Sequence, residues 1–142
     1  MLCDEVMKKN VVKIGLAESA RTAAELMRTG NLGFLPVTDE QGRAVGTITD
    51  RDLAIRVLAD ALDPSTSIST VMTKEVVSCK PTDDIETARH LMESYHKSRI
   101  VVSDDSGEVR GIISLSDLAI LAPTQQSGDT LRRVAEREAR PS

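Results

Sequence analysis

The sequence predicts an α/β protein built from two copies of one β-α-β-β-α unit, and three observations support this fold class. Sliding the 142-residue chain by 65 positions aligns residues 6–55 with 71–120 without a gap. Eighteen of those fifty positions are identical, whereas average amino-acid usage gives about three by chance. Short β-branched runs alternate with stretches of helical periodicity in the same order in both copies. Each copy also ends in Gly-x-x-[Ser/Thr]-x-x-Asp, within GTITDRDL (46–53) and GIISLSDL (111–118).

Each copy is expected to run strand, helix, strand, strand, helix. The β-branched and apolar runs predict strands at 11–14, 34–37 and 44–49 in the first copy, and at 76–79, 99–102 and 109–114 in the second. Helical spacing of apolar residues predicts helices at 19–29, 50–61, 85–94 and 116–121. Acidic or hydroxyl groups suited to helix starts precede two of them, at Glu18–Ser19 and at Thr82–Asp84. The turns 39–42 and 104–107 each end in glycine, where we expect a positive φ.

The repeat predicts a first motif at residues 1–62, a second at 63–122 and a polar tail at 123–142. One copy of ~60 residues buries too little apolar surface to be comfortably stable alone, so we expect the two copies to pack together. In the tail, Asp129 or Thr130 is suited to begin a short helix with Leu131, Val134 and Ala135 on one side. A helix of that length is marginal by itself, and we expect the tail to be partly ordered.

Composition excludes several classes of protein. The formal net charge of −4, the pI of about 5.2 and the presence of only two aromatic residues, Phe34 and Tyr95, argue against a nucleic-acid partner. Residues 1–15 do not resemble a signal peptide, and no apolar run approaches the ~20 residues that span a bilayer, so we expect a cytoplasmic protein with no membrane partner. Cys3 and Cys79 follow no ligand spacing and are expected to be reduced thiols, with a long-range disulfide between them as the less favoured alternative.

No residues suggest a catalytic or metal site. A metal centre needs three or four converging ligands, and the chain offers only His90, His96 and two distant cysteines. The sequence contains no Gly-x-Ser-x-Gly elbow and no glycine-rich phosphate loop. We therefore expect no catalytic residues, no metal and no required cofactor, and we expect that the protein is not an enzyme.

The repeated motif places a hydroxyl and a carboxylate at a strand-to-helix junction, where free backbone N–H groups favour an anion. Asp52 or Asp117 can accept hydrogen bonds from a ribose diol, and Thr49 or Ser114 can donate to a phosphate oxygen. The motif glycine permits a close approach of backbone or ligand. A structural alternative is that the aspartates cap their helices and the glycines occupy bulges. Capping and ligand binding are compatible with each other.

These residues carry a resemblance to a known family. Val-Met before the first strand, Leu-Pro-Val in the second strand and Gly-x-x-[Ser/Thr]-x-x-Asp at the last junction resemble a CBS motif. Two in tandem over residues 3–122 resemble a CBS pair, or Bateman module, in which the motifs pack with pseudo-two-fold symmetry. The resemblance implies a free-standing bacterial-type CBS protein. Its ligand would be AMP, ADP or ATP, with NAD or S-adenosylmethionine as alternatives.

The resemblance also implies two ligand sites. KSRIVVSDDSGEVRGIISLSD (97–117) is similar to an AMP-holding repeat of the γ subunit of AMP-activated protein kinase. The stronger candidate site therefore comprises Arg99, Ile112, Ser114, Ser116 and Asp117, with Lys8, Val12, Leu32 and Gly33 from the other repeat. The first-copy site would comprise Thr49, Arg51, Asp52, Thr73, Val77 and Ser98. There Phe34 replaces the arginine, which weakens the expectation of phosphate binding.

Within these sites, Val12, Val77 and Ile112 are suited to sandwich a purine, and backbone amides to read its edge. We expect a regulatory or sensor module that signals to a partner by a conformational change. Two alternatives remain: an interaction protein whose clefts stay empty, and an enzyme of unrecognised type.

The two long helical segments of each copy, 19–29 with 50–61 and 85–94 with 116–121, carry more apolar residues than one buried stripe needs. These residues are Leu53, Ile55, Val57, Leu58, Leu62, Leu118, Ile120 and Leu121. Together with the resemblance, they predict a homodimer through the helices, with the ligand clefts near the subunit contact.

Overall fold

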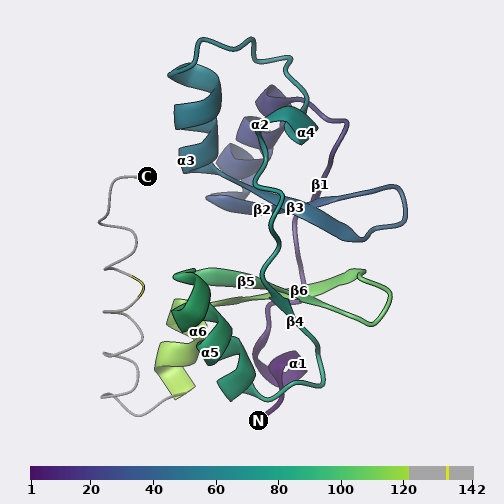
Figure 1. The fold of residues 1–142 in the computed structure, drawn as a ribbon, viewed down its shortest axis with the longest axis vertical. Coiled ribbons are helices and arrows are strands. Elements are labelled where there is room, and N and C mark those ends of the chain that lie inside the picture. The colour runs from purple at the N-terminus through teal and green to yellow at the C-terminus, as the bar shows by residue number, and fades with distance from the viewer. Residues whose placement is uncertain (122–133, 135–142) are drawn as a thin grey trace. The chain divides into compact units, whose positions relative to one another are not determined.

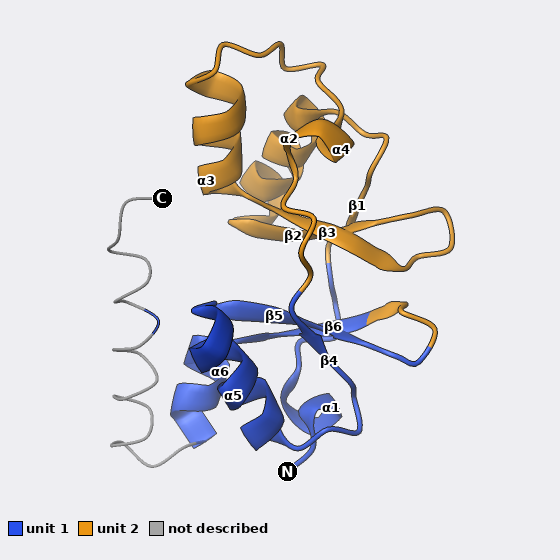
Figure 2. Cartoon of the chain, in the orientation of Figure 1, with its two compact units in different colours: residues 1–11, 77–105, 110–142 blue, residues 12–76, 106–109 orange. Residues whose placement is uncertain are grey.

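The computed structural model describes residues 1–121 and Val134, and the chain divides into two compact units (Figure 2). Unit 1 comprises residues 1–11, 77–105 and 110–142, and unit 2 comprises residues 12–76 and 106–109. The predicted tail lies outside the described residues except for Val134, which is buried. Unit 1 thus combines most of the second repeat with residues 1–11, and unit 2 combines most of the first repeat with residues 63–76 and with residues 106–109 of the second hairpin.

Unit 2 contains a three-stranded sheet in the order β1-β2-β3. The strands are β1 (Ile14–Gly15), β2 (Phe34–Thr38) and β3 (Ala44–Thr49). β1 runs parallel to β2, whereas β2 and β3 form an antiparallel hairpin in which Leu35 lies opposite Ile48. The helices are α2 (Ala20–Gly30), α3 (Asp50–Asp52), the π-helix η1 (Leu53–Leu58) and α4 (Ile68–Val71). These helices cover one face of the sheet (Figure 1). Leu35 and Ile48 are buried in the core between the sheet and the helices.

Unit 1 repeats this plan with the sheet order β4-β5-β6. Its strands are β4 (Ser78–Cys79), β5 (Arg99–Ser103) and β6 (Val109–Ser114), and its helices are α1 (Cys3–Val6), α5 (Ile85–Tyr95) and α6 (Leu115–Leu121). The helices again lie on one face of their own sheet (Figure 1). Met92, Ile100 and Ile113 are buried in the core of this unit. The predicted α/β class and the two repeated units are therefore confirmed.

The predicted caps and turns explain where the elements begin and end. Ser19 Oγ accepts from the Thr22 N–H at 3.1 Å to start α2, and Asp84 Oδ1 accepts from the Glu86 N–H at 2.9 Å to start α5. Side chains of this kind satisfy N–H groups that have no partner inside the helix. In both hairpin turns the glycine has the expected positive φ, +78° at Gly42 and +88° at Gly107.

Three expectations need correction. The first strand of each copy is shorter than predicted, because only Ile14–Gly15 and Ser78–Cys79 pair with a neighbouring strand. The last helix of unit 2 was expected to be regular from 50 to 61, yet it passes into η1, where the Ala59 N–H donates to the Ala54 carbonyl at 2.9 Å. The four-residue helices α1 and α4 were not predicted, since one turn carries no readable periodicity.

The short helices belong to the segments that the two units exchange. α1 lies in the N-terminal segment (residues 1–11) and α4 in the linker segment (residues 66–76), and the two helices are 65 positions apart, like the repeats themselves. Lys8 and Ile112 exchange backbone hydrogen bonds of 2.9 and 3.1 Å in unit 1. Thr73 and Thr47 do the same at 2.9 Å in unit 2. Each segment therefore packs against the repeat that it does not directly precede.

Candidate functional site

The junction between β6 and α6 in unit 1 brings three polar side chains of the second motif together. The Ser114 N–H donates to Asp117 Oδ2 at 2.9 Å, and the Asp117 N–H donates to Ser114 Oγ at 3.2 Å. This reciprocal pair satisfies backbone groups at the start of the helix. Ser114 Oγ also lies 2.8 Å from Ser116 Oγ. The aspartate therefore caps the helix, as the structural alternative predicted.

Capping leaves part of the Asp117 carboxylate open to another partner. Its Oδ1 atom faces Lys8 Nζ at 4.0 Å, and its side chain is 16% exposed, whereas that of Lys8 is 73% exposed. An ion pair this long and this exposed contributes little to stability. Because an ionised carboxylate has about four acceptor positions, Asp117 can accept hydroxyl groups while it caps the helix.

Arg99 adds a cation next to this junction. The Leu115 N–H donates to the Ser98 carbonyl at 2.7 Å, which holds the start of β5 against the start of α6. Arg99 is the next residue and is exposed. Within residues 1–121 its side chain makes no hydrogen bond or ion pair. An exposed guanidinium one residue away from a backbone contact with this junction is a candidate to bind a phosphate there.

The junction of β3 and α3 in unit 2 has the same reciprocal pair with different charges. The Thr49 N–H donates to Asp52 Oδ2 at 3.0 Å, and the Asp52 N–H donates to Thr49 Oγ1 at 3.1 Å. The Asp50 N–H donates to the Gly33 carbonyl at 3.1 Å, and the neighbouring residue in β2 is the apolar Phe34. Arg51 is exposed on α3. Cations here come from the helix, because the strand supplies none.

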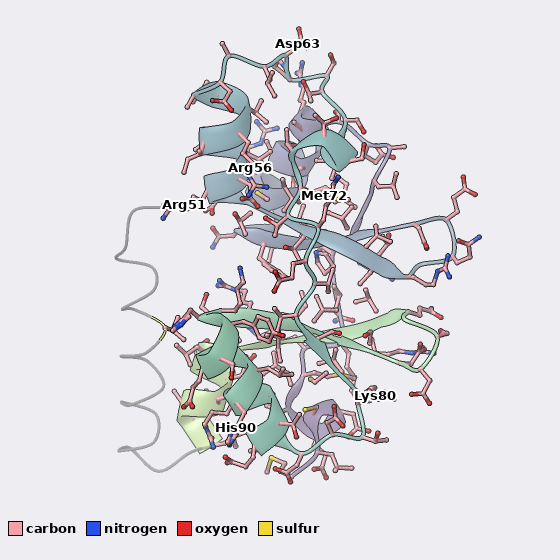
Figure 3. All side chains as sticks on the ribbon, in the orientation of Figure 1. Arg51, Arg56, Asp63, Met72, Lys80 and His90 are labelled. Atoms are coloured by element: carbon pink, nitrogen blue, oxygen red, sulfur yellow. The ribbon has the colours of Figure 1, made fainter. Side chains whose placement is uncertain are left out.

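Arg56 is a functional candidate that the sequence reasoning missed. Its Nη2 atom lies 3.8 Å from Asp52 Oδ1, and its Nη1 donates to the Val71 carbonyl at 3.0 Å. The side chain thus points from η1 toward the linker segment next to Met72 (Figure 3). Arg56 follows Asp52 by four positions, the spacing at which helical side chains meet, so this pair was readable from the sequence.

The structure distributes the predicted site residues between the two units. Unit 1 brings together Lys8, Arg99, Ile112, Ser114, Ser116 and Asp117, and unit 2 brings together Thr49, Arg51, Asp52 and Thr73. The remaining five predicted residues lie in the opposite unit from the other members of their predicted site. Val12, Leu32 and Gly33, predicted for the site with Asp117, lie in unit 2. Val77 and Ser98, predicted for the site with Asp52, lie in unit 1. Gly33 and Ser98 each accept a backbone hydrogen bond from the junction of their own unit. Val77 is buried in its unit's core, whereas Val12 is exposed.

Close packing explains why both motifs have glycine at their first position. A Cβ on Gly111 would lie 2.5 Å from Met7 Sδ and 2.9 Å from the Lys8 carbonyl oxygen. A Cβ on Gly46 would lie 2.6 Å from Met72 Sδ and 2.9 Å from the Thr73 carbonyl oxygen. The close approach at both positions is therefore made by the segment packed against the strand.

The described residues offer neither a metal site nor a membrane-spanning helix. Among residues 1–121 and Val134, no three His, Cys, Asp or Glu side chains gather in a way that could hold a metal ion. In the same part of the chain, every helix is too short or too polar to cross a membrane.

Comparison with known families identifies the class of protein. The CBS domain family model matches residues 3–59 and 68–122. The chain therefore belongs to the CBS domain family, and the tandem pair predicted from the repeat is confirmed. The CBS domain-containing protein YhcV of Bacillus subtilis is 35% identical over 132 residues, which cover 92% of this chain and 93% of that protein.

Solved structures agree with this family. The CBS domain protein TA0289 from Thermoplasma acidophilum is similar with a TM-score of 0.81 and 25% identity, covering 94% of this chain and 75% of that one. The CBS domain pair of protein MJ0100 has a TM-score of 0.76 and 28% identity, covering 85% and 94%. The MJ0100 structure is a complex with 5′-methylthioadenosine and S-adenosyl-L-methionine.

Proposed function

We propose that this chain is a cytoplasmic sensor or regulatory module that binds an adenosine nucleotide and signals to a partner by a conformational change. AMP, ADP and ATP are the leading ligands, and NAD and S-adenosylmethionine are the alternatives. The observation that carries the proposal is the junction in unit 1, where Ser114, Ser116 and Asp117 converge beside Arg99.

Each group has a defined role in this proposal. The outward Oδ1 of Asp117, which lies 4.0 Å from Lys8 Nζ, accepts hydrogen bonds from the ribose hydroxyls. Arg99 and the exposed Ser116 bind phosphate oxygens, since charge-assisted hydrogen bonds are the stronger kind. Ile112 provides an apolar contact for the base. The adenosine moiety in the MJ0100 complex supports this class of ligand.

The unit 2 junction is proposed as a second, weaker phosphate site. Thr49 and Asp52 repeat the hydroxyl and carboxylate, and Thr73 is hydrogen bonded to β3 as Lys8 is to β6. Phe34 takes the place of Arg99, so Arg51 would have to supply the positive charge. A ligand with less charge than ATP suits this junction better.

An interaction protein with empty clefts is the second candidate, because one specific observation favours it. The capping hydrogen bonds already give the repeated hydroxyl and aspartate a structural purpose in both units. Under this alternative the motif is repeated because both helices need the same cap.

Thermal unfolding of the native chain with AMP, ADP, ATP, NADH or S-adenosylmethionine separates the two candidates. A ligand present at 100 times its Kd adds about 2.7 kcal/mol of stability. We expect at least one adenosine compound to raise the Tm, and the matching guanosine compound, used as a control, to raise it less. If none of the five compounds changes the Tm at millimolar concentration, the chain is an interaction protein. Incubation with ATP and chromatography of the products tests for catalysis, and we expect no hydrolysis.

We also propose that the chain forms a homodimer through the last helices of its units. Leu58 at the end of η1 is 80% exposed and Ile120 in α6 is 83% exposed, and apolar side chains this open are suited to a second copy. Nucleotide binding at the junctions that begin these helices would then change the shape of the dimer. Light scattering at micromolar concentration tests the assembly, and a mass near the 15.4 kDa monomer would contradict it.

A further inference from the structure

Two thiols lie side by side in the core of unit 1. Cys3 of α1 and Cys79 of β4 are 76 positions apart in the sequence, and their Sγ atoms are 3.6 Å apart. Both are free thiols, with exposed fractions of 0% and 5%. Nothing in the spacing of the two cysteines in the sequence indicates this contact. Only the packing of the N-terminal segment against the second repeat brings them together.

The packing of the fold does not require sulfur at these positions. With the offset of 65 residues, Cys3 corresponds to Ile68 and Cys79 to Ile14, and both isoleucines are buried in the core of unit 2. The same architecture is thus built once with two isoleucines and once with two thiols in contact. This difference points to a role for the thiols beyond filling space.

Backbone hydrogen bonds hold the two segments that carry the thiols against each other. The Cys3 N–H donates to the Asp83 carbonyl at 2.8 Å, and the Asp4 N–H donates to the Pro81 carbonyl at 3.0 Å. α1 is therefore fixed against the turn that follows β4. A disulfide needs the sulfurs to close to about 2.05 Å. Rotation of two side chains on neighbouring backbone segments can supply most of that movement.

We propose that Cys3 and Cys79 form a reversible disulfide that fastens the N-terminal segment to unit 1. In the reduced state this segment is held by hydrogen bonds and packing alone. In the oxidised state a covalent bond joins α1 to β4, five residues before Lys8, whose backbone pairs with β6. The proposal does not depend on nucleotide binding.

The direction of the thiol hydrogen bond assigns the order of reaction. The Cys79 S–H donates to Cys3 Sγ. Burial raises the pKa of the Cys3 thiol, and this hydrogen bond opposes part of the rise, whereas burial and the neighbouring Cys3 both raise the pKa of Cys79. Because Cys3 Sγ accepts this hydrogen bond, a neighbouring donor stabilises its thiolate, which makes Cys3 the thiol that reacts first and Cys79 the one that resolves the intermediate.

With hydrogen peroxide as the oxidant, the chemistry balances in two steps. The Cys3 thiolate attacks one peroxide oxygen, the O–O bond breaks, and the released hydroxide takes up the thiol proton to give water and a sulfenic acid. Cys79 then attacks the Cys3 sulfur, the S–S bond forms, and the sulfenic oxygen leaves as a second water with the Cys79 proton. Two thiols lose two electrons, which reduce one peroxide to two waters.

Burial means that the reaction has to proceed through local opening of the N-terminal segment. α1 is a single turn of four residues, so this opening breaks the backbone hydrogen bonds that join residues 1–4 to residues 81–85 and leaves those of the sheet in place. Once the bond has formed, it closes a long loop and restricts the unfolded chain, which raises stability. The disulfide is therefore expected to form slowly and to stabilise the fold once it has formed.

The test uses the full native chain treated with hydrogen peroxide. We expect the intact mass to fall by two hydrogen atoms and a non-reducing digest to join the peptides that contain Cys3 and Cys79. The Tm should rise by roughly 10 °C, and dithiothreitol should reverse all three changes. Cys3→Ser and Cys79→Ser, tested singly, should lose the intramolecular link.

The double variant Cys3→Ile with Cys79→Ile, which copies the core of unit 2, is the matched control for folding. It should unfold cooperatively, and peroxide should leave its Tm unchanged. Two results would overturn the proposal. One is a folded chain whose thiols stay reduced under conditions that cross-link the same chain in denaturant. The other is a cross-linked chain that is less stable than the reduced one.

Discussion

Units 1 and 2 share one architecture, and they differ mainly in charge and sulfur. Both have a three-stranded sheet, a capped central helix and a junction closed by a hydroxyl and an aspartate. At the junction of unit 1, a strand supplies the cation, Arg99. At the junction of unit 2, the helix supplies Arg51 and Arg56, and the strand supplies Phe34.

This comparison separates two kinds of residue. The repeated residues meet requirements that the fold imposes twice: the glycine admits the backbone of the exchanged segment, and the aspartate caps the helix. The residues that differ are free of those requirements, so they are the ones that can specialise. The difference between the two junctions is therefore to be sought in Arg99, Ser116 and Lys8, and the difference between the two cores in the thiol pair.

The largest expected effect on stability comes from replacing the motif glycine in each unit. The two replacements show whether both units need glycine to the same extent. Gly111→Ala and Gly46→Ala should each lower the free energy of unfolding by about 3 kcal/mol, because the new Cβ would meet a backbone carbonyl that cannot rotate away. Denaturant titration measures both. Gly15→Ala is the matched control, since its Cβ would meet only Glu18 Cγ at 3.7 Å, and we expect a change within about 0.5 kcal/mol.

A second variant tests which atoms cause that loss. Met7→Ala added to Gly111→Ala removes the Sδ contact but leaves the Lys8 carbonyl oxygen 2.9 Å from the new Cβ. Stability should recover in part only. Full recovery would show that the side chain, and not the exchanged backbone, demands the glycine.

The next prediction concerns the cation that unit 2 lacks. Arg99→Ala should weaken AMP binding by roughly 10- to 100-fold, because each charge-assisted phosphate contact contributes about 1.5–3 kcal/mol. Adenosine carries no phosphate, so its affinity should change less than twofold. Calorimetric titration with both ligands measures the difference. Equal losses for AMP and adenosine would remove Arg99 from the phosphate site.

The two aspartates provide a third prediction. Asp117→Ala should weaken nucleotide binding at least tenfold, and Asp52→Ala should weaken it less if the unit 1 junction is the main site. Each variant also loses a helix cap, at a cost of about 1 kcal/mol. Asp117→Asn is the control, since asparagine retains the capping oxygen but removes the charge. Unchanged binding in Asp117→Ala would argue against the site itself.

Most of the fold was predictable because the evidence for it was duplicated. The hairpin strands 44–49 and 109–114 match β3 and β6 in both bounds, because alternating burial and a glycine turn mark them clearly. The ends of β1 and β4 could not be predicted, because each of these strands is only two residues long. The packing of the N-terminal segment against the second repeat has no local sequence signal, so the thiol contact was hidden as well.

The candidate site was predictable in its chemistry and less so in its grouping. Ser114, Ser116, Asp117 and Lys8 lie together at the junction of unit 1. Gly33 and Ser98 were assigned through family geometry, and each contacts the junction of its own unit through backbone atoms. Backbone contacts of this kind depend on strand order and register, which a side-chain pattern does not encode.

Arg56 allows a smaller test of the difference between the junctions. Arg56→Leu, which introduces the residue found at the corresponding position 121, should lower the free energy of unfolding by about 1 kcal/mol through loss of the hydrogen bond to the Val71 carbonyl. The 3.8 Å contact with Asp52 adds little, because the arginine is largely exposed. Arg51→Leu is the control, with an expected change within about 0.5 kcal/mol. Equal losses would show that the linker contact is not specific.

The smallest effect concerns the caps of the two central helices. The cap of α5 in unit 1 is the acidic Asp84, and the cap of α2 in unit 2 is the neutral Ser19. Hydrogen bonding from the Glu86 N–H lowers the pKa of Asp84, whereas Ser19 does not titrate. A carboxyl group with a lowered pKa in the folded state stabilises the fold above its unfolded pKa, near 4. That stabilisation is lost as the pH falls through the folded value. The stability of unit 1 should therefore depend on this cap at neutral pH and not in acid.

Exchanging the two caps isolates this effect. Asp84→Ser should make unfolding less sensitive to acid, so that the stability of the variant relative to the native chain rises as the pH falls from 6 to 3. Ser19→Asp should do the reverse, because an aspartate in that place would also accept from the helix N–H groups and lose the bond on protonation. Denaturant midpoints measured across this pH range provide the comparison. If the stabilities of the two variants change with pH in the same direction, the cap positions 84 and 19 do not play the same part in the two units.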